Sequence, residues 1–235
     1  MERGHMGAHS FTDTYSLEEP HRAESVAASA IRRALDLVVA TLLLTLLAPV
    51  LIVVAVVIRL DSPGPVLYRQ RRIGRSMRPF IVNKFRTMRP DADETRHRDY
   101  VYALISTGRD DTCAGRGNLY KLLGDDRVTR AGHLLRRFSL DELPQLWNVV
   151  RGEMSLVGPR PVIPYEVEQY PVWYRERFVV KPGLTGLWQV SGRNEKTYED
   201  MVRLDIEYAR TQRLSLDLRI MLKTFWVVVR ARGAA

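Results

Sequence analysis

Two adjacent carboxylates, Asp141 and Glu142, stand among arginines and turn-forming residues and are the strongest candidates for chemistry. Neighbouring residues on a helix point roughly 100° apart, so the pair is poorly placed to face each other across a sugar as glycosidase carboxylates do. The two could instead divide the work, one as a nucleophile and the other as a metal ligand. A structural interpretation competes: Ser139 and Glu142 have the Ser-x-x-Glu spacing of a capping box, and both carboxylates suit a first helical turn.

Cations that suit a phosphate group lie nearby in the sequence. Arg136 and Arg137 precede the carboxylates and could clamp phosphate oxygens through paired hydrogen bonds, and a helix N-terminus also attracts phosphate. Arg160 stands between two prolines that limit its backbone, which indicates either a fixed cationic finger or a plain surface turn. Residues 181–194 suit a structured loop over a polar ligand and equally a hairpin.

The composition narrows the function classes without selecting one. The chain has 235 residues and a net charge of +9, so nucleic acid, an anionic membrane and phosphorylated substrates all remain as partners. The single cysteine, Cys113, excludes a disulfide framework and a cysteine-based zinc site. His97 and His133 stand alone, and no P-loop, dinucleotide-binding glycine fingerprint, HExxH or GxSxG pattern occurs.

Residues 37–58 carry no charge, although the mean hydropathy of the chain, −0.19, suggests a soluble protein. At about 1.5 Å per residue this segment is roughly 33 Å long as a helix, enough to cross a bilayer core. Pro49 removes the hydrogen bond to the Thr45 carbonyl and predicts a kink. Arginines flank both ends, and the positive-inside rule places each flank in the cytoplasm. We therefore favour a re-entrant helix that bends at Ala48-Pro49 over a straight crossing or a buried core helix.

The remaining patterns predict an α+β fold in three parts: a polar, flexible tail (1–30), the membrane helix (31–60) and a catalytic domain at the membrane surface (61–235). Residues 66–68 and 79–85 predict a short β-hairpin. Helices are expected over 134–150, with breaks near Ser139 and Pro144, and over 198–212. Residues 216–229 suit an amphipathic helix in the membrane interface or a core helix.

Several motifs together resemble the bacterial sugar transferase family, the monotopic phosphoglycosyl transferases that start the assembly of cell-surface glycans. The resemblance runs from about Ile31 to Val229 and preserves the order of the blocks. The blocks are Arg32-x-x-x-Asp36, the proline-broken apolar helix, KFRTM at 84–88, SLDELPQLWN at 139–148, GPRP at 158–161 and KPGLTG at 181–186.

The resemblance implies transfer of a sugar-1-phosphate from a UDP-sugar to undecaprenyl phosphate, with release of UMP and a requirement for Mg²⁺. By position, Asp141 would be the nucleophile that forms a covalent phosphosugar intermediate, and Glu142, with Asp141 beside it, would hold the magnesium. The expected phosphate-binding residues are Arg136, Arg160, Lys84 and Arg86. The family usually has serine before the helix-breaking proline; here Ala48 stands there, so Thr45 or Thr41 would have to satisfy the backbone groups freed by the kink.

The implied partners are a UDP-sugar, undecaprenyl phosphate and anionic phospholipids of the inner leaflet, at the cytoplasmic face of a bacterial plasma membrane. Nucleic acid is not expected, and a homodimer is left open. Donors in the family range from hexoses to N-acetylated amino sugars, and products include exopolysaccharide, capsule, O-antigen and glycoprotein glycans. The alternative from another class is a non-catalytic, membrane-anchored module that binds anionic lipid or nucleic acid through its basic hairpin. Electrostatic binding alone would not require the carboxylate pair.

Overall fold

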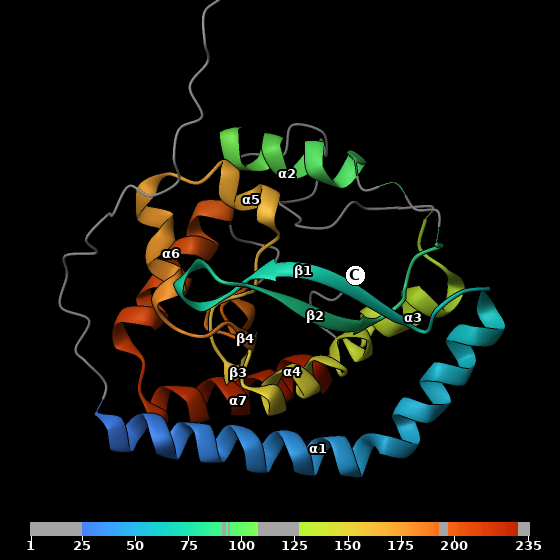
Figure 1. Ribbon diagram of the computed structural model, residues 1–235, viewed down its shortest axis with the longest axis horizontal. Coiled ribbons are helices and arrows are strands. Elements are labelled where there is room, and N and C mark those ends of the chain that lie inside the picture. Colours follow the sequence, from blue (N-terminus) through green and yellow to red (C-terminus); the bar gives the residue numbers. More distant parts are fainter. Residues whose placement is uncertain (1–24, 91–92, 94, 108–126, 193–196, 230–235) are drawn as a thin grey trace, which may run out of the picture.

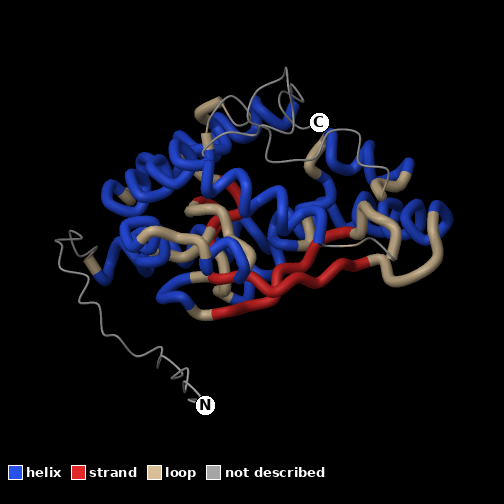
Figure 2. The backbone as a smooth tube through the Cα atoms, turned by 90° about the horizontal axis from the view of Figure 1, so that it is seen from above, coloured by secondary structure: helices blue, strands red, loops and turns tan. Residues whose placement is uncertain are grey.

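The computed structural model describes residues 25–90, 93, 95–107, 127–192 and 197–229 (Figure 1). The expected tail lies outside the described residues as far as residue 24. Figure 2 shows a body made mostly of helices, with a two-stranded ribbon along one side. The predicted α+β class is confirmed in this form.

The chain between residues 130 and 151 folds as two helices joined by a tight turn, as its apolar period predicts. Helix α3 spans Arg130–Arg137, the 3-10 turn η2 spans Leu140–Glu142 and α4 spans Gln145–Arg151. The predicted helix after residue 198 is α6, Tyr198–Thr211. The other helices are α2 (Thr95–Thr107), α5 (Pro164–Glu168), η3 (Val172–Val179), η4 (Trp188–Val190) and α7 (Leu214–Val229).

The predicted hairpin is confirmed, and its first strand is longer than expected. Strands β1, Leu67–Ile73, and β2, Pro79–Phe85, pair antiparallel, with the short η1 turn, Arg75–Met77, between them. Tyr68 lies opposite Lys84 and Arg72 opposite Phe80. Because side chains alternate between the faces of a strand, Tyr68, Gln70 and Arg72 share one face of the ribbon with Lys84.

A second, shorter pair of strands joins two of the sequence motifs. Strand β3, Ser155–Val157, pairs parallel with β4, Gly183–Thr185, so the hairpin considered for residues 181–194 is wrong. The backbones approach so closely that a Cβ on Gly183 would lie 2.0 Å from the Gly158 nitrogen. Glycine is therefore required at this crossing, which sets the loop carrying Arg160 beside β4.

Helix α1 is one continuous element, Val26–Asp61, of 36 residues. It begins before the expected boundary at residue 31, because Ser25 caps its first turn by accepting a hydrogen bond from the Ala28 amide at 3.2 Å. Figure 1 shows that α1 changes direction: its first part lies beside α4 and α7, and its last part turns toward α3. Among the described residues it is the one helix long and apolar enough to cross a membrane.

The threonine expected to compensate for Ala48 makes a different contact. The Thr45 hydroxyl donates to the Thr41 carbonyl at 2.9 Å, one turn earlier in the helix. That hydroxyl is therefore not directed at the Thr45 carbonyl, which Pro49 leaves without its helical donor. The expectation that Thr45 compensates for the proline is wrong in this geometry.

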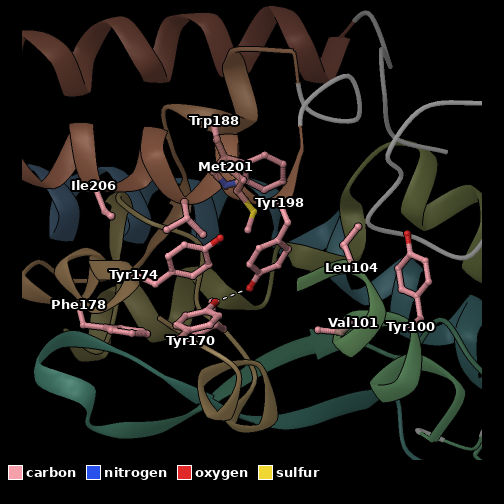
Figure 3. Close-up of a cluster of buried hydrophobic side chains, with 12 residues drawn as sticks. Tyr100, Val101, Leu104, Tyr170, Tyr174, Phe178, Trp188, Tyr198, Met201 and Ile206 are labelled. Carbon is pink, nitrogen blue, oxygen red and sulfur yellow. Dashed lines mark hydrogen bonds between the residues drawn. The ribbon is translucent and has the colours of Figure 1, made fainter. Parts of the chain in front are cut away.

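Three buried clusters hold these elements together. The aromatic cluster packs Tyr170, Tyr174 and Phe178 of the η3 region against Tyr198 of α6, with the Tyr170 and Tyr198 hydroxyls 2.5 Å apart (Figure 3). A second cluster packs the first part of α1 against α4, β3, α6 and α7, and a third packs its last part against β2 and α3. Helix α7 buries Ile220 but exposes Leu222, Phe225 and Trp226, so it has both a core face and an exposed apolar face.

Candidate active site

A cleft of about 520 Å³ opens between the hairpin, α3 with η2, and the loop that follows β3. All six residues predicted from the sequence to act on substrate line it. These are Lys84, Arg86, Arg136, Asp141, Glu142 and Arg160. The six come from three separate stretches of the sequence, 84–86, 136–142 and 160, so tertiary folding assembles the site.

The carboxylate pair sits on η2, in a turn that the capping-box prediction did not describe correctly. Ser139 adopts the left-handed conformation, with φ 56°, and its side chain makes no capping hydrogen bond. An N-cap normally has an extended backbone that aims its oxygen at the next turn, which a left-handed residue cannot do. Instead, the Ser139 carbonyl accepts a hydrogen bond from the Glu142 amide at 3.3 Å. Asp141 and Glu142 are therefore half-buried side chains on a tight turn that faces the cleft.

Lys84 and Arg136 lie beside this turn. The Lys84 ammonium is 2.8 Å from Glu142 Oε1, and the two side chains are 22% and 39% exposed, so solvent or substrate can replace the contact. Arg136 Nε donates to the Thr87 hydroxyl at 3.0 Å. Helix α3 approaches Thr87 closely, because a Cβ on Gly132 would lie 2.1 Å from the Thr87 carbonyl oxygen. The end of β2 and the helix that carries Arg136 are therefore held in fixed relation.

Arg86 lines the cleft but holds the end of α1. Its Nη1 donates to the Pro63 carbonyl at 2.8 Å, and its Nη2 donates to the Ser62 carbonyl at 2.7 Å. These contacts satisfy carbonyls just beyond a helix C-terminus, where a cation is favoured. These contacts engage Arg86 at the end of α1, and the phosphate-binding role that the resemblance implies for it stays a prediction.

Arg160 is fixed through its backbone. Its amide donates to Asp205 Oδ2 at 3.4 Å, and its carbonyl accepts from Arg177 Nη2 at 3.3 Å. Arg177 and Asp205 also pair with each other, with both side chains fully buried. Burial raises the pKa of Asp205 to about 6, against the opposing effect of Arg177. Within the described part of the chain, the Arg160 guanidinium has no hydrogen bond or salt bridge, so it is available to the cleft.

Sequence reasoning missed Arg72, which lines the cleft next to Arg160. Its Nη1 donates to the Pro161 carbonyl at 3.0 Å and its Nη2 to Gln70 Oε1 at 2.6 Å. Burial, and after it the charge of Arg160, lowers its pKa to about 10. The signal available in the sequence was the alternation of Tyr68, Gln70 and Arg72, which share one face of a strand, and only the fold shows that this face lines the cleft.

His97 and Tyr165 form another pair that isolated inspection of the sequence did not find. His97 Nδ1 and the Tyr165 hydroxyl share a hydrogen bond of 2.6 Å, and both residues line the cleft. Burial lowers the pKa of His97 to about 4, and the cations Arg160 and Arg72 act in the same direction. His97 is therefore neutral near pH 7 and can offer the substrate a polar group without charge.

The carboxylates of the cleft can be compared with the ligands that the expected magnesium ion would need. Among the residues that the structure describes, no three His, Cys, Asp or Glu side chains gather as a ready-made metal site. Magnesium is commonly held by one or two carboxylates, with waters and substrate phosphates completing its octahedron. Asp141 and Glu142, adjacent at the cleft, fit that mode of binding and not an all-protein cage.

Comparison with known proteins points to one family. The family model described as bacterial sugar transferase matches residues 27–231. The chain is 45% identical over 204 residues to the UDP-galactose-lipid carrier transferase of Erwinia amylovora, covering 87% of this chain and 41% of that protein. It is 40% identical over 206 residues to the exopolysaccharide production protein ExoY of Rhizobium meliloti, covering 86% and 87%.

A third relative is named for a specific reaction. The UDP-glucose:undecaprenyl-phosphate glucose-1-phosphate transferase of Caulobacter vibrioides is 44% identical over 207 residues, covering 85% of this chain and 70% of that protein. The chain thus spans less than half of the Erwinia amylovora relative and most of the other two. The family match, these relatives and the assembled cleft agree: the chain belongs to the bacterial sugar transferase family.

Proposed function

We propose that this chain transfers a sugar-1-phosphate from a UDP-sugar to undecaprenyl phosphate and thereby starts the assembly of an exopolysaccharide or related glycan. The observation that carries the proposal is the cleft, in which the η2 carboxylates lie among Lys84, Arg136 and Arg160. The names of the relatives from Caulobacter vibrioides and Erwinia amylovora indicate UDP-glucose and UDP-galactose as the first donors to test.

In the proposed first step, an Asp141 oxygen attacks the β-phosphorus of the UDP-sugar. The bond from that phosphorus to the bridging oxygen breaks, and UMP leaves with the bonding electron pair. In the second step, an oxygen of undecaprenyl phosphate attacks the same phosphorus and releases the Asp141 carboxylate. Splitting the reaction in this way means that the soluble donor and the lipid acceptor need not be bound together.

The like charges of carboxylate and diphosphate oppose the first step by several kcal/mol at about 4 Å and an effective dielectric near 20. Lys84, Arg136 and Arg160 offset this repulsion and hold the phosphate oxygens while the leaving group departs. Magnesium bound at Asp141 and Glu142 would neutralise phosphate charge further. The neutral His97–Tyr165 pair adds polar groups without adding repulsion or attraction for the diphosphate.

The membrane part of the proposal is that α1 re-enters the cytoplasmic leaflet. Near its start, Arg33 donates to the Val149 carbonyl of α4 at 2.6 Å. Just beyond its end, Arg86 of the same globular domain donates to the Ser62 and Pro63 carbonyls. A helix whose two ends are bonded to one cytoplasmic domain cannot place those ends on opposite sides of a bilayer.

The test is UMP release from UDP-glucose and UDP-galactose by protein in nanodiscs with Mg²⁺ and undecaprenyl phosphate. Asp141→Asn is expected to abolish release, because the amide is not a competent nucleophile. The matched control Glu207→Gln, an exposed carboxylate on α6, should retain wild-type activity. With labelled donor and no acceptor, mass spectrometry should find the sugar phosphate on the peptide that contains Asp141.

Full activity of Asp141→Asn, or a phosphosugar on a different residue, would refute the nucleophile. If the wild type released no UMP from any UDP-sugar but bound anionic vesicles, the non-catalytic binding module would be the better account.

A further inference from the structure

The cations of the cleft are gathered in two places. Lys84 and Arg136 lie beside η2, whereas Arg72 and Arg160 lie toward the other end of the ribbon. Lys84 is paired with Tyr68, and Arg72 follows Tyr68 by four residues on the same face of β1. At about 3.3 Å per residue, the backbone positions from which Lys84 and Arg72 project are therefore roughly 13 Å apart along the ribbon.

Arg72 is an unusual group to bury. It is 6% exposed, and the described residues supply acceptors for two of its nitrogens, the Pro161 carbonyl and Gln70 Oε1. Its Nε is buried without a hydrogen-bond partner. A guanidinium carries five N–H donors, and buried donors are normally all satisfied. The wall of the cleft therefore holds more cationic donors than its own acceptors use.

The neighbouring charges are also unbalanced. Glu166 Oε1 lies 3.9 Å from Arg72 Nη1, and burial raises the pKa of this carboxyl. Arg160, Arg72 and a hydrogen bond from Tyr198 lower it by more, so Glu166 is ionised. One carboxylate thus faces two guanidiniums, whose mutual repulsion an anion in the cleft would relieve.

Buried groups behind the wall of the cleft hold the Arg160 backbone and contact Arg72. The Arg160 backbone is clamped by the buried Arg177–Asp205 pair, and Arg177 Nη1 also donates to the Tyr170 hydroxyl at 3.0 Å. Tyr170 contacts Tyr198 (Figure 3). The Tyr198 hydroxyl in turn donates to Glu166 Oε2 at 2.7 Å. A rigid network that keeps two like charges together is the expected support for an anion receptor.

We propose that Arg72 and Arg160 form a second phosphate subsite of the cleft, separate from the cations beside η2, and that it takes a phosphate monoester dianion. Rigid planar guanidiniums suit paired hydrogen bonds to phosphate oxygens. The inference rests on the proposed function, which supplies two sources of this group. They are the phosphate retained by the UMP leaving group and the phosphate of the lipid acceptor. The first is favoured, because it is bonded to the phosphorus under attack at η2.

The experiment measures the affinity of the full chain in nanodiscs for UMP and for uridine. Arg72→Met keeps the length of the side chain and removes the charge, and Arg71→Met removes an exposed arginine on the opposite face of β1. The ratio of the uridine Kd to the UMP Kd measures the contribution of the phosphate group to binding. General damage to the fold would weaken the binding of both ligands and leave the ratio unchanged. The ratio is expected to fall about tenfold or more in Arg72→Met and to stay unchanged in Arg71→Met.

An unchanged ratio in Arg72→Met together with unchanged rates of both half-reactions, or an equal fall of the ratio in both variants, would overturn the subsite. If Arg72→Met gave no folded protein, Arg72→Gln would replace it with the same expected and contradicting results.

The two half-reactions separate the sources of phosphate. Slower formation of the Asp141 adduct with unchanged transfer to acceptor supports UMP, and the reverse supports the lipid phosphate. The Kd values and the half-reaction rates of each variant are compared with those of the wild type. If the wild type itself released no UMP, the proposed function, and not the subsite alone, would be refuted.

Discussion

At the scale of single residues, the cleft combines charged and neutral polar groups that its burial keeps in defined protonation states. Glu166 is held ionised by Arg160, Arg72 and its hydrogen bonds, whereas His97 is held neutral chiefly by burial. The positive charge of the cleft is thus confined to its arginines and lysine, as the proposed binding of phosphates requires. The histidine contributes a hydrogen-bonding group only.

The state of His97 makes the stability of the fold depend on pH. Its pKa falls from 6.5 to about 4 on folding, because burial disfavours the imidazolium. Between these values the unfolded chain takes up a proton that the folded chain does not, so the stabilising contribution is complete above pH 6.5 and is lost as the pH falls. Through His97 alone, going from pH 7 to 5 should cost about 2 kcal/mol, and the raised pKa of Asp205 opposes part of this loss in all variants. The measurement is urea unfolding in detergent at both values. In His97→Gln the pH dependence should flatten, whereas the exposed His133→Gln control should keep it; equal slopes in all three proteins would contradict the assignment.

At the scale of elements, the site depends on close packing between segments that carry different functional groups. The hairpin presents Lys84 and Arg72 at different points of one face, while α3 and η2 present Arg136 and the carboxylates. Gly132 lets α3 rest against the Thr87 carbonyl, and Gly183 lets β4 rest against the loop that contains Arg160. These glycines set how closely the elements meet.

The variant Gly132→Ala tests whether helix propensity or packing dominates the effect of this residue on stability. Propensity alone predicts that alanine inside α3 would stabilise the helix by about 1 kcal/mol. Packing predicts the opposite sign, a loss of roughly 1–3 kcal/mol, because the new Cβ would lie 2.1 Å from the Thr87 carbonyl oxygen. The free energy of unfolding should therefore fall, and UMP release should fall with it as Arg136 moves. Leu134→Ala, at a position 56% exposed on the same helix, should leave both nearly unchanged. A Gly132→Ala protein more stable than wild type would show that α3 shifts freely.

At the scale of the whole molecule, α1 is a long apolar helix that the globular domain holds at both ends. Arg32 Nε pairs with Asp217 of α7 at 2.6 Å, and Asp36 accepts hydrogen bonds from Ser155 and the Leu156 amide. At the other end, Asp61 accepts from the Ala131 amide at 3.2 Å. Between these ends the helix exposes a row of apolar side chains. Among them are Val38, Leu42, Leu46, Ile52, Val53 and Val56.

This arrangement predicts the topology of the chain in a membrane. In a protein with Cys113 replaced, Ser25→Cys before α1 and Glu207→Cys on α6 should both react with an impermeant maleimide in inside-out vesicles only. Leu46→Cys, 69% exposed on α1, should resist labelling from either side because lipid covers it. Labelling of Ser25→Cys and Glu207→Cys from opposite sides would establish a crossing helix and exclude re-entry.

Local patterns predicted elements well where each element follows from its own residues. The hairpin, the breaks at Ser139 and Pro144, and α6 were all readable, because alternation, proline and apolar period act over a few residues. The capping-box prediction failed because Ser139 has a left-handed backbone, which the Ser-x-x-Glu spacing does not reveal. The parallel pairing of β3 with β4 failed because it joins residues distant in the chain.

The sequence by itself determined the kinds of chemistry: an adjacent carboxylate pair, phosphate-seeking arginines and an uncharged helix broken by proline. These follow from composition and short spacing, which a linear chain displays directly. Only the tertiary structure decided which cations share the cleft with Asp141. Arg86, which lines the cleft, also binds the carbonyls at the end of α1, and Arg72 lines the cleft from the face of a strand. The physical reason is that a side chain's role depends on the acceptors around it, and those come from residues far away in sequence.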